Sequence, residues 1–124
     1  MQDHPAAHEL LDAVAEYLVA ELRPDVPSEQ RFKVLVAANL CAVVARELRA
    51  GEAPSVADAE LFNALAGGGE GPPAPGEADA EAERRAQELV KIIRAGEADQ
   101  RLPELLEALS EHVARKLEVS RPGY

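Results

Sequence analysis

The feature that most constrains the fold is an apolar run, VLVAANLCAVVA, at residues 34–45. Asn39 is its only strongly polar residue. At about 100° per residue, its apolar side chains fall on opposite faces of a helix, and such a helix is either buried or crosses a membrane. Lys33 and Arg46 bound the run, which is shorter than the roughly 18 apolar residues of a spanning helix. We therefore predict no membrane association, and we expect other helices, or a second copy of the chain, to cover this segment on most sides.

Sequence signals mark both ends of this central helix. Pro27 interrupts the preceding chain, and Ser28 is a residue type that caps the free amides of a first helical turn. Arg49 adds positive charge to the last turn, where the helix dipole favours it. Gly51 accepts the left-handed backbone that often ends a helix. These signals predict a helix over residues 28–50.

Two further helices are predicted in the first half of the chain. Residues 5–22 form an amphipathic segment, and the short connection after it predicts antiparallel packing against the central helix. Ser55 followed by Asp58 resembles a capping box. We expect it to open a short helix over residues 55–66.

The segment GGGEGPPAPG at residues 67–76 has the composition of a flexible linker. It is expected to separate the first three helices from a C-terminal helical hairpin over residues 77–95 and 103–120. The buried stripes expected on these two helices are Ala82, Ala86, Leu89, Val90 and Ile93 on the first, and Leu102, Leu106, Leu109, Val113 and Leu117 on the second.

Composition supports an all-α fold. Hydrophobic residues make up 47% of the chain but aromatic residues only 3%, so the core must consist of Ala, Leu and Val, which suits close-packed helices better than strands. A chain of 124 residues is the size of one domain. We predict a single helical domain over residues 1–124, a small helix bundle of four longer helices plus one short helix around the central helix at 28–50.

Charge and cysteine content exclude several functions. A net charge of -10 argues against binding to nucleic acid or to anionic membranes, both of which require a basic surface. Cys41 is the only cysteine, so no internal disulfide can form, and its apolar surroundings predict an inert core thiol. Without a visible signal peptide, these features predict a cytoplasmic protein.

Motifs for chemistry are incomplete. His8 and Glu9 open a segment that resembles a zinc signature, but Asp12 stands where the second histidine belongs, on the solvated face of the helix. The glycines of residues 67–76 lack the Gly-Lys-Ser/Thr sequence and the preceding strand of a phosphate loop. No catalytic triad is convincing. The sequence therefore predicts no catalytic residue, no metal site and no cofactor.

Three residues are candidates for a buried polar or ligand-facing role: Asn39, Tyr17 and His112. A buried Asn39 amide must be hydrogen-bonded, because an unpaired one costs about 1–3 kcal/mol. One interpretation is a packing or register device, bonded to a loop carbonyl or to the same residue across a dimer axis. The other is an amide facing a ligand in a pocket between helices, lined also by Tyr17 and His112.

Three stretches, residues 8–24, 31–48 and 116–124, with IRAGE at 93–97 between them, resemble a family of small bacterial all-helical proteins known as a domain of unknown function. The pattern of the family has a Phe seven residues before the Asn of a Val-Ala-Ala-Asn run and a long apolar helix that ends in Arg-Glu-Leu. The matching residues are Phe32, Val36, Ala37, Ala38, Asn39, Arg46, Glu47 and Leu48.

The chain also departs from that pattern. The family often has Arg four residues before the Asn, where Leu35 stands here, so a polar Arg–Asn pair does not carry over. The tail at residues 121–124 reads RPGY rather than an Asn-Pro-Arg-Tyr-like sequence.

The resemblance implies an accessory role. Family members are often encoded beside aminoglycoside- or choline-kinase-like phosphotransferases and acyl-CoA-dehydrogenase-like enzymes. The sequence therefore favours a non-enzymatic interaction protein that forms a homodimer or binds such an enzyme. The alternative is a small-ligand binder or small enzyme with a pocket near Asn39.

Overall fold

A computed structural model describes residues 3–123 of the chain, and within that range all regular structure is helical, which confirms the all-α fold class and a small helix bundle. The chain divides into two compact units at the junction between Gly51 and Glu52. We call the part up to Gly51 unit 1 and the part from Glu52 onward unit 2. The division therefore lies before the short third helix rather than at the linker 67–76.

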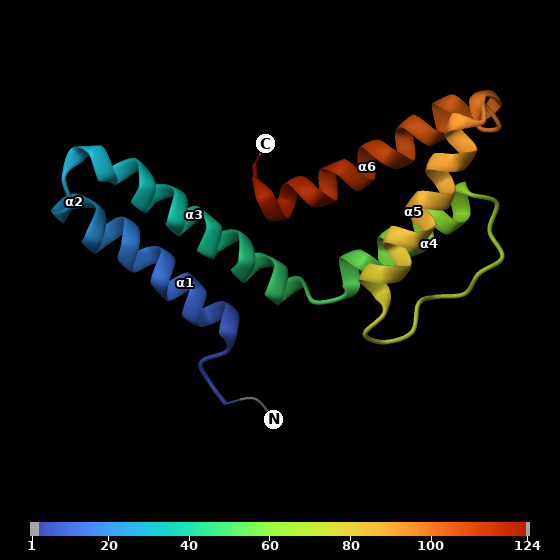
Figure 1. Ribbon diagram of the computed structural model, residues 1–124. Helices are drawn as coiled ribbons and strands as arrows, with labels where there is room; N and C mark the ends of the chain where they lie inside the picture. Colours follow the sequence, from blue (N-terminus) through green and yellow to red (C-terminus); the bar gives the residue numbers. More distant parts are fainter. Residues whose placement is uncertain (1–2, 124) are drawn as a thin grey trace. The chain divides into compact units, whose positions relative to one another are not determined.

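Unit 1 is a helical hairpin. Its elements are α1 (Ala7–Tyr17), the π-helical turn η1 (Leu18–Leu22), the short α2 (Arg23–Asp25) and α3 (Ser28–Ala50). Helices α1 and α3 lie side by side and antiparallel, as predicted (Figure 1). The bounds of α3 agree with the predicted range 28–50.

The first helix continues beyond its predicted end through a wide turn. Pro24 lies within α2, and because it has no amide hydrogen it cannot complete a regular α-helical bonding pattern. In the turn before it, the amide of Arg23 donates to the carbonyl of Leu18, five residues back. Arg31 of α3 then donates to the carbonyl oxygens of Pro24, at 3.3 Å, and Val26, at 3.4 Å. These bonds connect the end of α2 to the first turns of α3.

Two of the predicted helix caps are wrong. Ser28 is the first residue inside α3, and Pro27 holds the cap position without a side-chain bond. Ser55 lies inside α4 (Ala53–Leu65), because Pro54 fits the first turn of a helix and lets α4 start earlier than expected. The hydroxyl of Ser55 instead donates to the carboxylate of Asp79 in unit 2.

Within unit 1, α3 is covered on one side only. The residues that pack toward α1 are small, with Ala38 and Ala45 buried, and small side chains let two helix axes approach closely. Half-buried residues of α3 include Val34, Cys41, Ala42 and Val43. An ion pair between Asp12 of α1 and Arg49 of α3 joins the two helices. The expectation that helices of the chain cover α3 on most sides is therefore wrong for unit 1, where α3 has one long neighbour.

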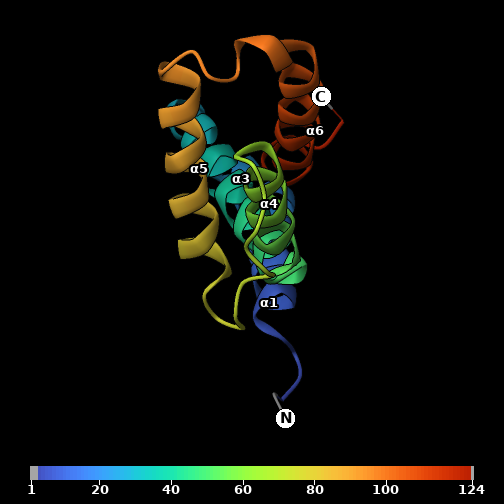
Figure 2. The same ribbon diagram turned by 90° about the vertical axis from the view of Figure 1, so that its right-hand side faces the viewer.

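Unit 2 contains α4, α5 (Ala78–Arg94), the 3-10 turn η2 (Asp99–Arg101) and α6 (Leu102–Ser120). Helix α4 packs against both α5 and α6, which are joined by the turn that includes η2 (Figure 2). The core residues of this unit come from all three helices and are Phe62, Leu65, Leu89 and Leu105, with Leu61, Ala86, Ala108 and Leu109 packed around them.

The buried faces of α5 and α6 differ from the predicted stripes. On α5 the buried residues are Ala78, Arg85 and Leu89, whereas Val90 and Ile93 of the predicted stripe are exposed. On α6, Leu105 is buried and three residues of the predicted stripe are exposed. These three are Leu102, Leu106 and Val113. The predicted stripes contain apolar residues only, whereas the buried face of α5 also includes a charged residue, Arg85.

The linker at residues 67–76 lies outside the helices and is attached to them within unit 2. Gly67, Gly68 and Gly69 all have positive φ angles (115°, 73° and 109°), which residues with a side chain rarely adopt. At the other end of the loop, the amide of Gly76 donates to Glu52 Oε1 at 2.9 Å. The segment is thus a loop that closes back on α4.

Candidate functional site

The largest apolar side chains of α3 form an exposed stripe on unit 1. Every fourth residue from 32 to 48 contributes to it, so the stripe follows one ridge of the helix. Phe32 is 72% exposed and Leu40 59% exposed. The five residues of this α3 stripe are Phe32, Val36, Leu40, Val44 and Leu48. Leu10, Val14 and Tyr17 of α1 are also exposed, so unit 1 leaves apolar surface open on both of its long helices.

Two of the predicted site residues lie in unit 1. Asn39 is exposed on α3, beside Leu40 of the stripe, because no helix of the unit covers that side. Tyr17, at the end of α1, is 52% exposed. The expected burial of Asn39 is therefore not found, and its role toward a ligand or a partner stays a prediction.

His112, the third predicted residue, lies in unit 2 and forms part of a polar cluster between α4 and α6. Its Nδ1 lies 2.8 Å from Asp58 Oδ1, and Arg115 donates to the same oxygen at 3.0 Å. The ring of His112 meets the ring of Phe62 edge to face, with centroids 5.0 Å apart. Asp58 thus holds two side chains of α6, which makes this cluster a connection between helices.

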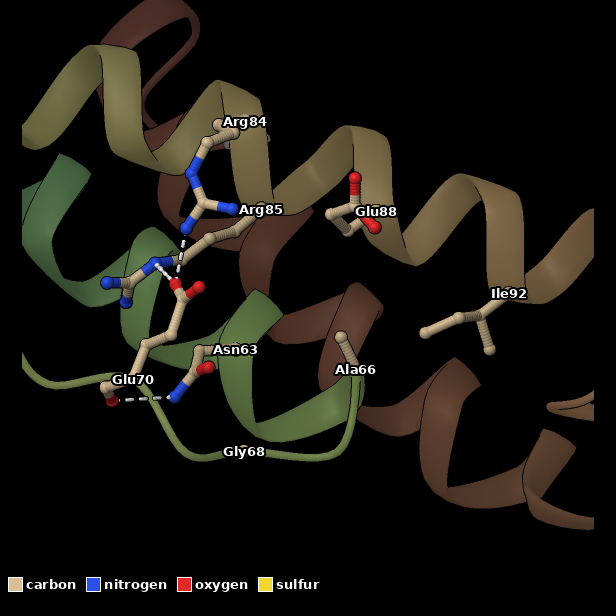
Figure 3. A pocket seen from close by; sticks show the side chains of 8 residues that line it. All are labelled: Asn63, Ala66, Gly68, Glu70, Arg84, Arg85, Glu88 and Ile92. Atoms are coloured by element: carbon tan, nitrogen blue, oxygen red, sulfur yellow. Dashed lines mark hydrogen bonds and ion pairs between the residues drawn. The ribbon is translucent and has the colours of Figure 1, made fainter.

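A pocket of about 170 Å³ lies in unit 2, between α4, α5 and the loop at residues 67–76. It is lined by Asn63, Ala66, Gly68, Glu70, Arg84, Arg85, Glu88 and Ile92. Figure 3 shows the carboxylate of Glu70 lying between the two arginine side chains. None of the three residues predicted from the sequence lines this pocket.

Arg85 is the most deeply placed charged group of the pocket and is only 5% exposed. A buried guanidinium requires acceptors for its N–H groups. Its Nη1 donates to the carbonyl of Ala59 at 3.2 Å and its Nη2 to the carbonyl of Gly71 at 2.8 Å. Its Nε lies 3.0 Å from Glu70 Oε2 and 3.4 Å from Glu81 Oε1. Arg85 therefore connects α4, α5 and the loop.

Arg84 is the second, more accessible cation of the pocket. Its Nε donates to Glu81 Oε1 at 2.9 Å, and its Nη2 also pairs with Glu70. This bond from Arg84 lowers the pKa of Glu81, and the two glutamates raise the pKa of Arg84. Because both glutamates contact both arginines, the four side chains form one alternating network of charges.

The chemistry of this pocket is that of anion binding, because guanidinium groups bind carboxylate and phosphate oxygens with paired hydrogen bonds. The sequence contains a signal for the pocket that lies outside the predicted apolar stripes. Arg85 stands seven residues after Ala78 and four before Leu89, the spacing of one helix face. A charged residue at a buried helical position indicates a partner elsewhere, although the spacing does not identify Glu70.

Metal-ligating clusters and membrane-spanning helices are both absent from the part of the chain that the structure describes. Over residues 3–123, no three or more His, Cys, Asp or Glu side chains are grouped so that they could hold a metal ion. Among the described helices, none combines the length and apolar character that crossing a bilayer demands.

Comparison with known proteins gives a family. No curated protein and no solved structure matches the chain. Residues 24–124 match the model of a domain of unknown function, DUF6285. The match includes all of α3 and unit 2, although Tyr124 of the resembling tail lies outside the described residues. The chain therefore belongs to the DUF6285 family.

Proposed function

We propose that this chain is a non-enzymatic interaction protein that binds another protein through the α3 stripe. The observation that carries the proposal is the exposure of the five large apolar side chains of the stripe, Phe32, Val36, Leu40, Val44 and Leu48. Single exposed apolar residues are common on protein surfaces, but a continuous row of them is typical of an interaction site.

The geometry of the stripe suits a helix as the binding partner. From Phe32 to Leu48 it extends for about 24 Å at roughly 1.5 Å per residue, which matches several turns of an opposing helix. A ridge formed by every fourth residue packs into the corresponding groove of a second helix, at a crossing angle near -50°. On α3, small residues are buried against α1, and the large residues remain exposed and available for this second contact.

The family resemblance suggests which partner to test. A phosphotransferase or acyl-CoA-handling enzyme encoded beside the gene is the first candidate, and a second copy of the chain is the other. The proposal places both proteins in the cytoplasm, which remains a prediction.

The test is to measure the mass of the purified chain by sedimentation, alone over a range of concentrations and then mixed with the neighbouring enzyme. We expect a complex with the enzyme or a homodimer. Leu40→Lys should weaken it at least about tenfold, because a charge is buried in the contact. Gln87→Lys makes the same change of charge at an exposed position of α5 and should leave the complex intact. A monomer that ignores the enzyme, or equal effects of both substitutions, would refute the proposal.

A further inference from the structure

We propose that Arg84 and Arg85 form a binding site for a small oxyanion, a carboxylate or phosphoryl group, and that Glu70 of the glycine-rich loop occupies this site in the absence of a ligand. The site is separate from the α3 stripe, because it lies within unit 2. Glu70 would then act as an internal substitute for the ligand.

The first support is the position of the Glu70 carboxylate. One oxygen, Oε2, contacts the Nη2 of Arg84 and lies 3.0 Å from the Nε of Arg85 (Figure 3). The carboxylate thus accepts a hydrogen bond from Arg84 and pairs with the charge of Arg85, as a carboxylate or phosphate bound between two arginines would. The arginine pair therefore already binds a carboxylate, which belongs to the class of ligand that we propose.

The second support is the burial of Arg85. Arg85 Nε is buried and makes no hydrogen bond, although Glu70 Oε2 and Glu81 Oε1 lie 3.0 and 3.4 Å away. A buried N–H group without an acceptor is costly, so an anion that accepts from Arg85 Nε would gain a hydrogen bond that Glu70 does not make. Arg84 contributes from the solvent side, where its side chain is 48% exposed and can guide an incoming anion.

The third support is the construction of the loop. Three glycines precede Glu70, and they allow the backbone to rotate with little steric resistance. The contacts of the loop with α4 and α5 centre on Glu70 and Gly71, whose carbonyl oxygens accept from Asn63, at 3.0 Å, and Arg85, at 2.8 Å. The side chain of Glu70 is itself 47% exposed, so water and small ions reach it.

Size and charge limit the ligand to a small group. A volume of about 170 Å³ holds several water molecules, and hence a group of four or five heavy atoms. Glu88 also lines the pocket and Glu81 pairs with both arginines, so negative charge remains nearby after Glu70 leaves. This favours an anion with one or two charges over a polyanion.

The test is a titration of the whole chain with sodium phosphate and, separately, sodium acetate, followed by two-dimensional NMR at constant ionic strength. Glu70→Gln removes the internal carboxylate but keeps the backbone carbonyls that hold the loop. We expect it to bind one or both anions at least about tenfold more tightly than the unaltered chain, with shifts at Asn63 and Gly68. Glu70→Asp, whose carboxylate reaches less far, should bind with intermediate affinity and serves as a second variant.

Two comparisons make the result specific. Adding Arg84→Gln to Glu70→Gln should abolish the gain, whereas adding Arg94→Gln, an exposed arginine of the same helix outside the pocket, should not. Preference for acetate would identify a carboxylate site and preference for phosphate a phosphoryl site. The proposal is overturned if Glu70→Gln and Glu70→Asp gain no affinity, if the gain survives loss of Arg84, or if sodium chloride causes the same shifts.

Discussion

The two units of this chain use apolar residues in opposite ways. Unit 2 buries Phe62, Leu65, Leu89 and Leu105 together, in a core to which three helices contribute. Unit 1 has only alanines among its buried residues on α3, Ala38 and Ala45, and exposes its larger side chains. The helix that carries the long apolar run is therefore one that its own unit covers on one side only.

The number of neighbours explains this difference. Helix α4 has a partner on two sides, α5 and α6, so large side chains from all three helices can meet. Helix α3 has one long neighbour in its unit, and a single helix covers only one face of another. Unit 2 also buries a charged residue, Arg85, which donates to two carbonyl oxygens. Among the described residues of unit 1, none of the buried ones is charged. A long apolar run thus does not by itself determine how many helices of the same unit will cover it.

The largest effect expected from this contrast is on the free energy of unfolding when a leucine is shortened to alanine. Leu89→Ala removes a buried side chain from the core of unit 2 and should lower the free energy of unfolding by about 2–5 kcal/mol. Leu40→Ala, on the exposed stripe, should change it by less than about 0.5 kcal/mol at low protein concentration. Urea unfolding followed by circular dichroism measures both. A large cost for Leu40→Ala that grows with protein concentration would place the stripe in a homodimer, whereas a large constant cost would contradict its exposure.

The next prediction concerns the small residues of unit 1. Ala38→Leu inserts a large side chain between α1 and α3 and should cost about 1–3 kcal/mol, because the helices must separate. Its neighbour Ala37 is exposed, so Ala37→Leu adds the same atoms to the same helix without that penalty. The difference between the two urea midpoints measures the effect. Equal midpoints would show that the contact between α1 and α3 is loosely packed.

For the charged interior of unit 2 we predict a comparable or smaller effect. Arg85→Met keeps most of the side-chain volume but leaves the carbonyls of Ala59 and Gly71 without this donor and Glu70 without this cation, at a cost of about 1–3 kcal/mol. Arg94→Met, on the exposed end of α5, should cost no more than about 0.5 kcal/mol. Thermal unfolding gives both values. If Arg85→Met were as stable as the unaltered chain, packing alone would hold the loop to α5.

The smallest expected effect is on the way in which the stability of the folded form depends on pH. Bonding to Arg84 lowers the pKa of Glu81 in unit 2, and the backbone amide of Ala6, with His4, lowers the pKa of Glu9 in unit 1. A carboxyl group with a lowered pKa stabilises the folded form above its ordinary pKa of about 4.3, and this contribution is lost as pH falls through the folded pKa.

We therefore expect urea midpoints to fall as the solution is acidified below that ordinary value. Glu81→Gln should flatten the curve and, because it removes an ion pair, should also reduce its dependence on salt. Glu9→Gln should flatten the curve with little change in salt dependence, since an uncharged amide is the main cause there. The same salt response for both variants would contradict these different causes.

Local features of the fold could be predicted from the sequence. Pro27 and Gly51 marked the bounds of α3, and Gly96, with a φ of 78°, follows the end of α5. These signals act over a few residues, because proline and glycine restrict or free the backbone where they stand.

Features that depend on distant contacts could not be predicted in the same way. The burial of Arg85 is one such feature, because nothing near it in sequence identifies the carbonyl of Ala59 as its acceptor. Asn39 looked buried because its neighbours are apolar, but burial depends on how many helices surround it. The division at Gly51 likewise follows from the packing of α4 against α5, a contact between segments separated by the loop at residues 67–76.

The wide turn at Leu18–Leu22 has a consequence for which one-residue deletions unit 1 can accept. A π turn holds one residue more than a regular α-helical path between the same points, and here it stands directly before Pro24. Losing one residue from the turn would restore a regular helix only if the proline were replaced as well. A deletion in the turn should therefore be accepted only together with a replacement of Pro24, whereas a one-residue deletion within α3 would rotate every later side chain of that helix by about 100° and disrupt its packing against α1.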